Sequence, residues 1–533
     1  MQRLHHSTTI LLSLLSGFLF WIGWTPNNFS AAIFFAFIPL FIIEEKEKNS
    51  YRFFLFTFLG LLSWNLFTTW WIWNSTMIGA WLAIAVNSLL MFIPWWGYRK
   101  TKKITNEKIA LAAFVVYWIS FEYLHQLDWG LSWPWLTLGN AFAERISWIQ
   151  WYEYTGTSGG SLWIVCVNVF LFFGYVRVNA MKPRFKTHLT IITTLVLPIL
   201  ISLYIEQKEI KKAQTNATGL KKNIVIVQPN IDPYEKISSG DLKKLSQSLL
   251  DLSIKKVDSN TTLLIWPETA LYAYGGIDEE RVKENAELEN IFAFLKKYPN
   301  IHLFTGIESY RIFPEKHSMY SRPMEGSGNF YEIYNGGMLA DSSGALQFYH
   351  KSMLVPGVET LPEFLLFLGP LFEKLGGTAG GYARQEIRTI IPLKNNHIIA
   401  PAVCYESIYG AYMSRYIKNG ANLIAIITND GWWGDTPGHQ QHMAYARLRA
   451  IENRKWVVRS ANTGISCFIN PAGIVALQTE WWKPDALKGS VYTDTRETFF
   501  VKWGDIISKM ALVMTGLMIG VCFFRNVSYK GRC

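Results

Sequence analysis

The stretch Ile398–Ser407, with the sequence IIAPAVCYES, predicts a buried strand that ends at a cysteine. A short non-polar run of this length is typical of a strand inside a sheet. Cys404 then stands where the strand gives way to a turn, and Glu406 follows two residues later. A scaffold can hold a nucleophile rigidly and still expose it at such a strand end. On this stretch alone a core cysteine is the simpler interpretation, because free cysteine is among the most buried residue types.

Two other stretches change that balance. Thr262–Ala270, TLLIWPETA, is a second apolar run, and it ends in the carboxylate Glu268. Phe348–Glu359, FYHKSMLVPGVE, places Lys351 directly after another predicted strand. A thiol, a carboxylate and a lysine at three strand ends make a complete set for acyl transfer. The thiol is the nucleophile, the carboxylate takes its proton, and the ammonium stabilises the oxyanion.

The composition indicates a membrane protein. Of the 533 residues, 50% are hydrophobic and 15% aromatic, while only 17% are charged. Soluble domains carry about 25% charged residues. The formal net charge of +11 comes from short basic clusters beside apolar segments. We interpret these clusters as determinants of membrane topology and expect no nucleic-acid partner.

The first 205 residues predict a helical bundle of about seven membrane spans, and an eighth span follows near the C-terminal end. Most of these segments approach the ~20 residues that a helix needs to cross a bilayer. The second segment is short, and three arrangements stay open for it: a tilted span, a helix at the membrane interface, or a continuation of the first span. The expected spans are 8–24, 30–43, 53–73, 77–96, 109–124, 161–178, 187–205 and 508–524.

Charged loops predict the orientation. Basic clusters follow the second, fourth and sixth segments, whereas the intervening loops carry few basic residues or none. Lysine and arginine favour the cytoplasmic side. Residues 206 to about 505 are therefore expected to face the extracytoplasmic compartment.

From Lys222 onward the pattern is that of a soluble α/β domain, in which strands and helices alternate. The sequence predicts three parts: a transmembrane bundle over 1–205, a catalytic domain over 220–500 and a C-terminal helix over 506–526. Within the domain we expect helices at 241–257, 279–298, 410–419 and 439–453, and a hairpin turning at 341–344.

Several features leave alternatives open. The Trp-rich loop 125–160 is either an aromatic belt at the membrane surface or, at Trp133–Trp135, the border of a lipid entrance. The apolar segment 361–383 is either a mobile arm on the bilayer or core. His439 and His442 lack a third ligand in register, so no metal site is expected. Cys404 must stay reduced, and no disulfide with Cys467 is expected.

The three chemical stretches resemble the Glu–Lys–Cys triad of the nitrilase superfamily, with Glu268 in WPE, Lys351 in HK and Cys404 in CYE. The whole chain resembles the apolipoprotein N-acyltransferase family, also through the long motif at 428–466. This resemblance implies a nitrilase-like αββα sandwich. It also implies that Glu268 is the base, Lys351 the oxyanion stabiliser and Cys404 the acyl-accepting nucleophile.

The resemblance implies further site residues. Supporting groups around the triad would be Asn335, Glu359, Tyr405 and Glu406, and Trp432 and Trp433 would lie on a loop near the substrate entrance. Trp135 is an entrance candidate from the Trp-rich loop itself. From the residues alone, Glu359 and Glu406 could equally form structural ion pairs. The run VPGVETLP replaces the family's VPFGEYVP, and 231–237 lacks a tryptophan that relatives carry, for which Tyr234 is a candidate substitute.

The implied reaction is ping-pong, without metal or other cofactor. Cys404 takes an acyl chain from a phospholipid, with phosphatidylethanolamine as the expected donor, and passes it to the α-amino group of a diacylglyceryl-cysteine on an apolipoprotein. The implied location is the bacterial inner membrane, with the catalytic domain in the periplasm, and we expect a monomer. The alternatives are a membrane-anchored nitrilase-type amidase that hydrolyses a C–N bond, and a non-catalytic lipid-binding or scaffold protein.

Overall fold

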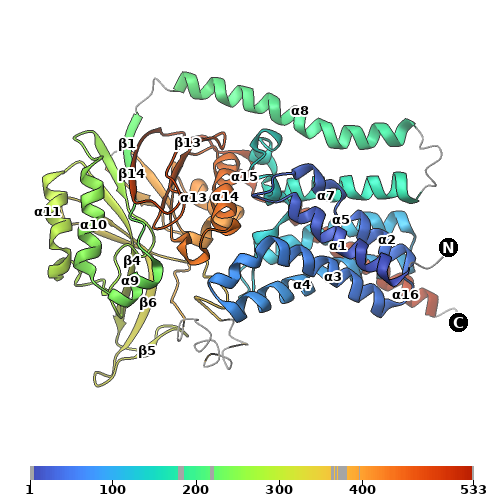
Figure 1. Cartoon of the computed structure of the whole chain (residues 1–533), viewed down its shortest axis with the longest axis horizontal. Coiled ribbons are helices and arrows are strands. Elements are labelled where there is room, and N and C mark those ends of the chain that lie inside the picture. The colour runs from blue at the N-terminus through green and yellow to red at the C-terminus, as the bar shows by residue number, and fades with distance from the viewer. Residues whose placement is uncertain are drawn as a thin grey trace. The chain divides into compact units, whose positions relative to one another are not determined.

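The computed structural model describes residues 5–177, 185–216, 221–361, 365, 369, 381–394 and 396–530. The chain forms two compact units, each considered by itself. Unit 1 comprises residues 1–73, 77–207 and 503–533, and unit 2 comprises residues 74–76 and 208–502. Unit 1 is helical, whereas unit 2 contains every strand within the described residues (Figure 1).

Unit 1 is a bundle of apolar helices. Five segments are long and apolar enough to cross a membrane: Ser50–Asn74, Met77–Ile104, Thr157–Val176, Phe185–Lys212 and Ile506–Arg525. Its main helices are α1 (His6–Ile22), α2 (Ile38–Lys46), α3 (Ser50–Thr69), α4 (Met77–Ile104), α5 (Glu107–Gln126), α7 (Thr157–Leu171), α8 (Phe185–Asn216) and α16 (Ile506–Lys530). The sequence-based count of eight spans stays a prediction, since α1, α2 and α5 fall outside those five.

The short second segment does not form one helix. Residues 30–35 are a 3-10 turn, and α2 begins only at Ile38, with Pro39 in its first turn. Proline lacks an N–H donor and is best accommodated in the first turn of a helix, which fits the start of α2 at this point. Asn168 of α7 satisfies the break: its side chain accepts from the Phe37 N–H and donates to the Ile33 carbonyl. Such pairing is required where water cannot hydrate the backbone.

Unit 2 contains two β-sheets. The first has the order β14-β1-β2-β4-β6-β5, with β3 on β4 and β7 on β6, and the second has the order β13-β12-β11-β10-β9-β8. The first-sheet strands are β1 (Lys221–Gln228), β2 (Thr261–Ile265), β3 (Ile277–Asp278), β4 (His302–Phe313), β5 (Arg322–Pro323), β6 (Phe330–Ala340), β7 (Leu346–His350) and β14 (Asp485–Tyr492). The second-sheet strands are β8 (Ile391–Pro392), β9 (Ile398–Val403), β10 (Leu423–Thr428), β11 (Val457–Ala461), β12 (Cys467–Ile469) and β13 (Val475–Gln478).

The sheets form the middle layers of an αββα sandwich. The Ser460 hydroxyl on β11 donates to the Val227 carbonyl on β1, so the central strands of the two sheets face each other. Helices α10 (Leu242–Ile254) and α11 (Glu289–Lys297) cover the first sheet, and α13 (Gly410–Lys418) and α14 (Pro437–Asn453) lie against the second (Figure 1). The nitrilase-like architecture expected from the resemblance is therefore confirmed.

One predicted helix is wrong over half of its length. The segment 279–298 is helical in regular α form only at Glu289–Lys297. Glu279 instead turns inward, where its carboxylate accepts hydrogen bonds from Ser309 and from His350 at 2.6 Å. Tertiary pairing of a buried carboxylate outweighs the modest helix propensity of the charged residues that follow it. The other three predicted helices are present as α10, α13 and α14, and the predicted hairpin is β6–β7.

Candidate active site

Cys404 stands directly after β9, at the first residue of a short 3-10 turn, Cys404–Ile408. Its φ of +52° lies in the left-handed region, which is strained for a residue with a Cβ. Two side chains hold its carbonyl: the Ser407 hydroxyl donates at 2.8 Å, and His442 Nε2 lies 3.2 Å away. Cys404 is a free cysteine, and the residue as a whole is partly exposed. This strand-to-turn geometry is the one expected from the sequence.

Glu268 follows β2 and is nearly buried, with 6% of its surface exposed. Its Oε1 accepts from Asn335 Nδ2 at 2.8 Å, and its Oε2 accepts from the Asn429 backbone N–H at 3.0 Å. A Cβ at Gly306 of β4 would meet the Pro267 carbonyl at 2.3 Å, so only glycine allows this close approach. The Glu268 carboxylate is thereby held by a side chain of β6 and by a backbone N–H that follows β10, while β4 lies close to the backbone of residues 267–269.

Lys351 follows β7 and is 1% exposed. Its ammonium donates to Glu359 Oε1 at 2.8 Å and lies 3.4 Å from Glu268 Oε1. Asn335 Nδ2 also donates to Glu359 Oε1, at 3.0 Å, so one amide links both carboxylates. Glu359 is itself anchored, because its Oε2 accepts from the Val355 N–H at 2.8 Å. The structure thus brings four of the predicted site residues into one buried cluster.

The electrostatics favour a neutral thiol beside a cationic lysine. Burial raises the pKa of the Cys404 thiol, and the Glu268 charge raises it further, while the Lys351 charge opposes them without reversing the shift. Burial alone would lower the pKa of Lys351, but the charges of Glu359 and Glu268 outweigh it and leave that pKa raised. Cys404 therefore rests as a neutral thiol, and Lys351 keeps its positive charge.

Glu406 links the Cys404 turn to the loop that follows Lys351. Its buried carboxylate accepts from the Val403 N–H at 2.8 Å and from the Ser352 N–H at 2.7 Å. The hydroxyls of Tyr349 and Tyr412 donate to the same carboxylate at 2.8 and 2.9 Å. Burial raises the pKa of Glu406, which these backbone donors oppose. Glu406 is fully buried, so its geometry is that of an orienting group.

A second buried network lies behind the cysteine. Asp430 Oδ1 lies 2.9 Å from His442 Nδ1, and its Oδ2 accepts from Arg459. Burial raises the pKa of Asp430, but the charges of Arg459 and His442 outweigh it and leave that pKa well below its usual range. His442 therefore connects an ionised carboxylate to the carbonyl of Cys404. Sequence reasoning singled out His442 only as a weak metal ligand.

The aromatic residues predicted at the substrate entrance lie in different settings. Trp432 is half-buried and packs edge-to-face on Tyr234, with ring centroids 5.2 Å apart, so these two candidates are neighbours. The Trp433 ring lies 5.6 Å from His442. Trp135 is buried in unit 1, stacked on Trp133 with centroids 5.6 Å apart, and its proposed entrance role has no support from exposure.

Tyr405, predicted as a supporting group, is buried, and the centroid of its ring lies 5.3 Å from that of Tyr409. The apolar segment 361–383 lies largely outside the described residues. The described part of the chain holds no group of three or more His, Cys, Asp or Glu side chains placed for a metal ion. His439 stacks on Trp481 with centroids 3.8 Å apart, away from such a role.

Sequence reasoning missed Lys236. This buried lysine on α9 (Pro233–Ser239) donates to the Thr269 carbonyl at 3.1 Å, one residue after Glu268. Burial lowers its pKa to about 8, although the Glu268 charge opposes that shift. The sequence around Lys236 shows only a lysine a few residues after the strand that ends in QPN, and this pattern does not predict burial. Asn429 was also missed as a donor, because its backbone N–H makes the contact.

Comparisons with known proteins match both units. Residues 224–498 match the carbon-nitrogen hydrolase family model, and residues 16–170 match that of the apolipoprotein N-acyltransferase N-terminal domain. An apolipoprotein N-acyltransferase from Chlorobaculum tepidum is 29% identical over 98% of this chain and 97% of its own. Another apolipoprotein N-acyltransferase, from Geobacter metallireducens, is 25% identical over 97% of this chain and 95% of its own. A solved CN-hydrolase superfamily protein from Xanthomonas campestris is 16% identical, with a TM-score of 0.36, over 51% of this chain and 91% of that one.

Proposed function

Because this chain belongs to the carbon-nitrogen hydrolase family and, with its full-length relatives, to the apolipoprotein N-acyltransferases, we propose that it N-acylates lipoproteins through a thioester on Cys404. The acyl donor in this proposal is a membrane phospholipid, with phosphatidylethanolamine as the first choice. The acceptor is the α-amino group of an N-terminal S-diacylglyceryl cysteine. The observation that carries the proposal is the buried pairing of Glu268 with Lys351, which is tied to the Cys404 turn in two ways. Glu406 accepts from the N–H groups of Ser352 and Val403, and Glu268 accepts from the N–H that follows β10, the neighbour of β9.

The first half-reaction begins with a neutral thiol. Glu268 takes the thiol proton as the Cys404 sulfur attacks the carbonyl carbon of the phospholipid ester. The oxyanion of the tetrahedral intermediate is stabilised by the Lys351 ammonium, which Glu359 holds at 2.8 Å. The C–O bond then breaks, the lysophospholipid oxygen takes the proton from Glu268, and the acyl chain stays on the sulfur as a thioester.

The second half-reaction uses the same groups. The lipoprotein amine attacks the thioester carbonyl, Lys351 again faces the oxyanion, and Glu268 accepts a proton from the attacking nitrogen. The C–S bond breaks, the thiolate regains a proton from Glu268, and the product is an amide. Asn335 and Glu406 serve as positioning residues, since one amide bridges Glu268 and Glu359 and one carboxylate ties the two catalytic loops.

The membrane setting supports a lipid donor over a small amide. Five helical segments are apolar enough to span a bilayer, and a hydrolase of soluble C–N substrates has no need of them. We place the chain in a bacterial inner membrane with unit 2 on the periplasmic side, from the basic loops of the sequence. A monomer suffices, because every group that we assign to the reaction comes from one chain.

The test is the intact mass of the full-length protein after incubation with phosphatidylethanolamine. Wild type should gain one hydroxylamine-labile acyl mass, and a diacylated lipopeptide should then discharge it. Cys404→Ala and Glu268→Ala should gain none, while Cys467→Ala, which removes a different buried thiol, should behave as wild type. An adduct that persists in Cys404→Ala would assign the nucleophile elsewhere. Turnover of small amides without any lipid adduct would favour the amidase.

A further inference from the structure

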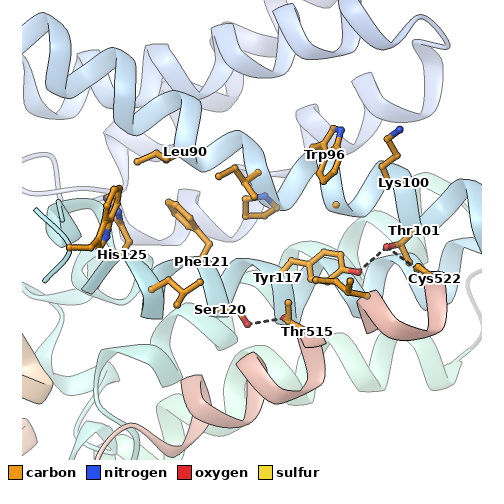
Figure 2. A pocket seen from close by; sticks show the side chains of 16 residues that line it. Leu90, Trp96, Lys100, Thr101, Tyr117, Ser120, Phe121, His125, Thr515 and Cys522 are labelled. Atoms are coloured by element: carbon orange, nitrogen blue, oxygen red, sulfur yellow. Dashed lines mark hydrogen bonds between the residues drawn. The ribbon is translucent and has the colours of Figure 1, made fainter. Parts of the chain in front are cut away.

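Unit 1 contains a groove formed by α4, α5 and α16, with a volume of about 520 Å³. All of its lining residues belong to unit 1, whereas the residues assigned to catalysis belong to unit 2. Figure 2 shows Leu90 and His125 toward one end and Lys100 and Cys522 toward the other. Its lining residues are Leu90, Ile93, Pro94, Trp96, Gly97, Lys100, Thr101, Tyr117, Ser120, Phe121, Leu124, His125, Trp129, Thr515, Ile519 and Cys522.

The polar groups of the groove bond mainly to one another. The Tyr117 and Thr101 hydroxyls lie 3.0 Å apart, and the Cys522 thiol donates to Thr101 at 3.7 Å. Ser120 and Thr515 form a second pair at 2.8 Å (Figure 2). These contacts join α4, α5 and α16 along the floor and satisfy its hydroxyls. The surface left for an occupant is therefore largely apolar.

The rim of the groove opens to the surroundings of the bundle. Ile93 is 54% exposed, Ile519 59% and Trp96 56%. Both α4 and α16 meet the length and composition of membrane spans, so the rim faces hydrocarbon when the chain lies in a bilayer. A groove of about 300–1,000 Å³ with apolar walls is large enough to bury a ligand rather than a single side chain.

One end of the groove carries a positive charge. The Lys100 ammonium lies 5.7 Å from the centroid of the Trp96 ring, and among the described lining residues no carboxylate accompanies it. From Leu90 to Lys100, α4 rises about 15 Å at 1.5 Å per residue, half of the ~30 Å hydrocarbon core. An acyl chain of one leaflet has this length, and its phosphate would then reach Lys100.

We propose that this groove is a binding site for one resident phospholipid, with an acyl chain along α4 and the phosphate paired with Lys100. Basic positions between membrane helices select phosphate-bearing headgroups. The lipid is a structural ligand and not the acyl donor, since no residue of the triad lines the groove. It stabilises the bundle by filling the space between α4 and α16, which a bulk lipid would occupy only transiently.

Native mass spectrometry of the full-length protein in detergent tests the proposal, with phosphatidylglycerol added after delipidation. Wild type should saturate at one tightly retained phospholipid. Ile93→Trp and Ile519→Trp fill the groove from its open side and should lose that lipid. Leu89→Trp is the matched control, because Leu89 is 50% exposed on the same helix and does not line the groove.

The headgroup contact has its own pair of variants. Lys100→Glu should weaken phosphatidylglycerol binding roughly tenfold, because it replaces an attraction with a repulsion at the phosphate. It should leave binding of diacylglycerol, which lacks the phosphate, unchanged. Lys103→Glu changes the same charge on an exposed residue outside the lining and should have little effect.

Three results would overturn the proposal. Equal lipid loss in Leu89→Trp and Ile93→Trp would mean that only bulk-like lipid is retained. Equal phosphatidylglycerol affinity in Lys100→Glu and wild type would remove the phosphate contact. Loss of Cys404 acylation in Ile93→Trp with an unchanged count of retained lipid would make the groove part of the donor route. Failure of acylation in every protein, with lipid retention as expected, would instead count against the proposed function alone.

Discussion

His442 provides the sharpest test of how the nucleophile is held. Its two ring nitrogens make different contacts: Nδ1 lies 2.9 Å from Asp430 and 3.2 Å from Arg459, and Nε2 lies 3.2 Å from the Cys404 carbonyl and 3.0 Å from the Ser407 hydroxyl. In His442→Gln the side-chain amide can reach the position of Nε2, so this variant keeps a polar contact to the Cys404 carbonyl and loses the Asp430 contact. In His442→Asn the amide can reach the position of Nδ1, so this variant keeps a contact to Asp430 and loses the contact to Cys404. The two variants therefore separate support of the nucleophile from support of the buried network.

The expected magnitude follows from the donors that remain. Ser407 still donates to the Cys404 carbonyl at 2.8 Å, so His442→Asn removes one of two contacts and does not orphan the oxygen. One such hydrogen bond contributes about 1 kcal/mol, which corresponds to roughly fivefold in rate. We expect that loss in the rate of thioester formation for His442→Asn, and a smaller loss for His442→Gln.

The assay is single-turnover acylation of Cys404, followed by intact mass, with thermal unfolding measured on the same samples. Both variants should lower the melting temperature, because each breaks one arm of a buried network. A structural role alone would make the rate follow the melting temperature in both. The reasoning is refuted if His442→Gln loses as much rate as His442→Asn, or if the two rates rank in the opposite order. His439→Gln, a buried histidine stacked on Trp481, controls for general damage to α14.

Three further predictions follow from the charges of the site. Glu268→Gln should abolish acyl transfer yet speed alkylation of Cys404 at pH 9, because removing the Glu268 charge lowers the thiol pKa; peptide-level mass spectrometry measures this, and slower alkylation would contradict it. Glu406→Gln should lower the rate at least tenfold with lipid binding intact, because an amide N–H then faces the Val403 N–H; an unchanged rate would count against a positioning role. Burial lowers the pKa of Lys236 to about 8, so between pH 8 and about 10 the unfolded chain binds a proton that the folded chain does not. The free energy of unfolding therefore rises with pH between about pH 8 and pH 10, and Lys236 adds no pH dependence below pH 8. In thermal unfolding, the melting temperature of Lys236→Met should depend less on pH in this range than that of wild type.

Local sequence predicted the parts of the site that depend on strand ends. Glu268, Lys351 and Cys404 each follow a short apolar run, and the fold places each at the end of β2, β7 or β9. A short apolar run in the sequence predicts a strand that is buried in a sheet, and the end of that strand is the first position at which a polar side chain is tolerated. The resemblance supplied what periodicity could not: that the two sheets pack face to face, so that three distant strand ends meet.

The rest of the site depends on contacts that no local pattern encodes. The donor that Asn429 gives to Glu268 is a backbone N–H, which every residue except proline possesses. Lys236 gives no periodic signal, since only the packing of α9 against Thr269 buries it. The charged pattern around Glu279 predicts a helix, whereas the carboxylate of Glu279 pairs with His350, 71 residues away in the sequence, and this contact fixes its conformation. Long-range pairing of buried polar groups thus determines this part of the site, and local sequence patterns do not predict it.

The burial of the triad sets the order of events in the proposed reaction. A thiol with a raised pKa is almost entirely protonated near neutral pH, so the lipid arrives at a neutral sulfur and not at a stored thiolate. Glu268 accepts hydrogen bonds from Asn335 and Asn429, which hold its carboxylate in place to receive the thiol proton. Sulfur attack and proton transfer together leave the new negative charge on the oxyanion beside the Lys351 ammonium, which stabilises it. Proton transfer is therefore coupled to attack, and the site stays unreactive toward solvent electrophiles while it waits for an ester.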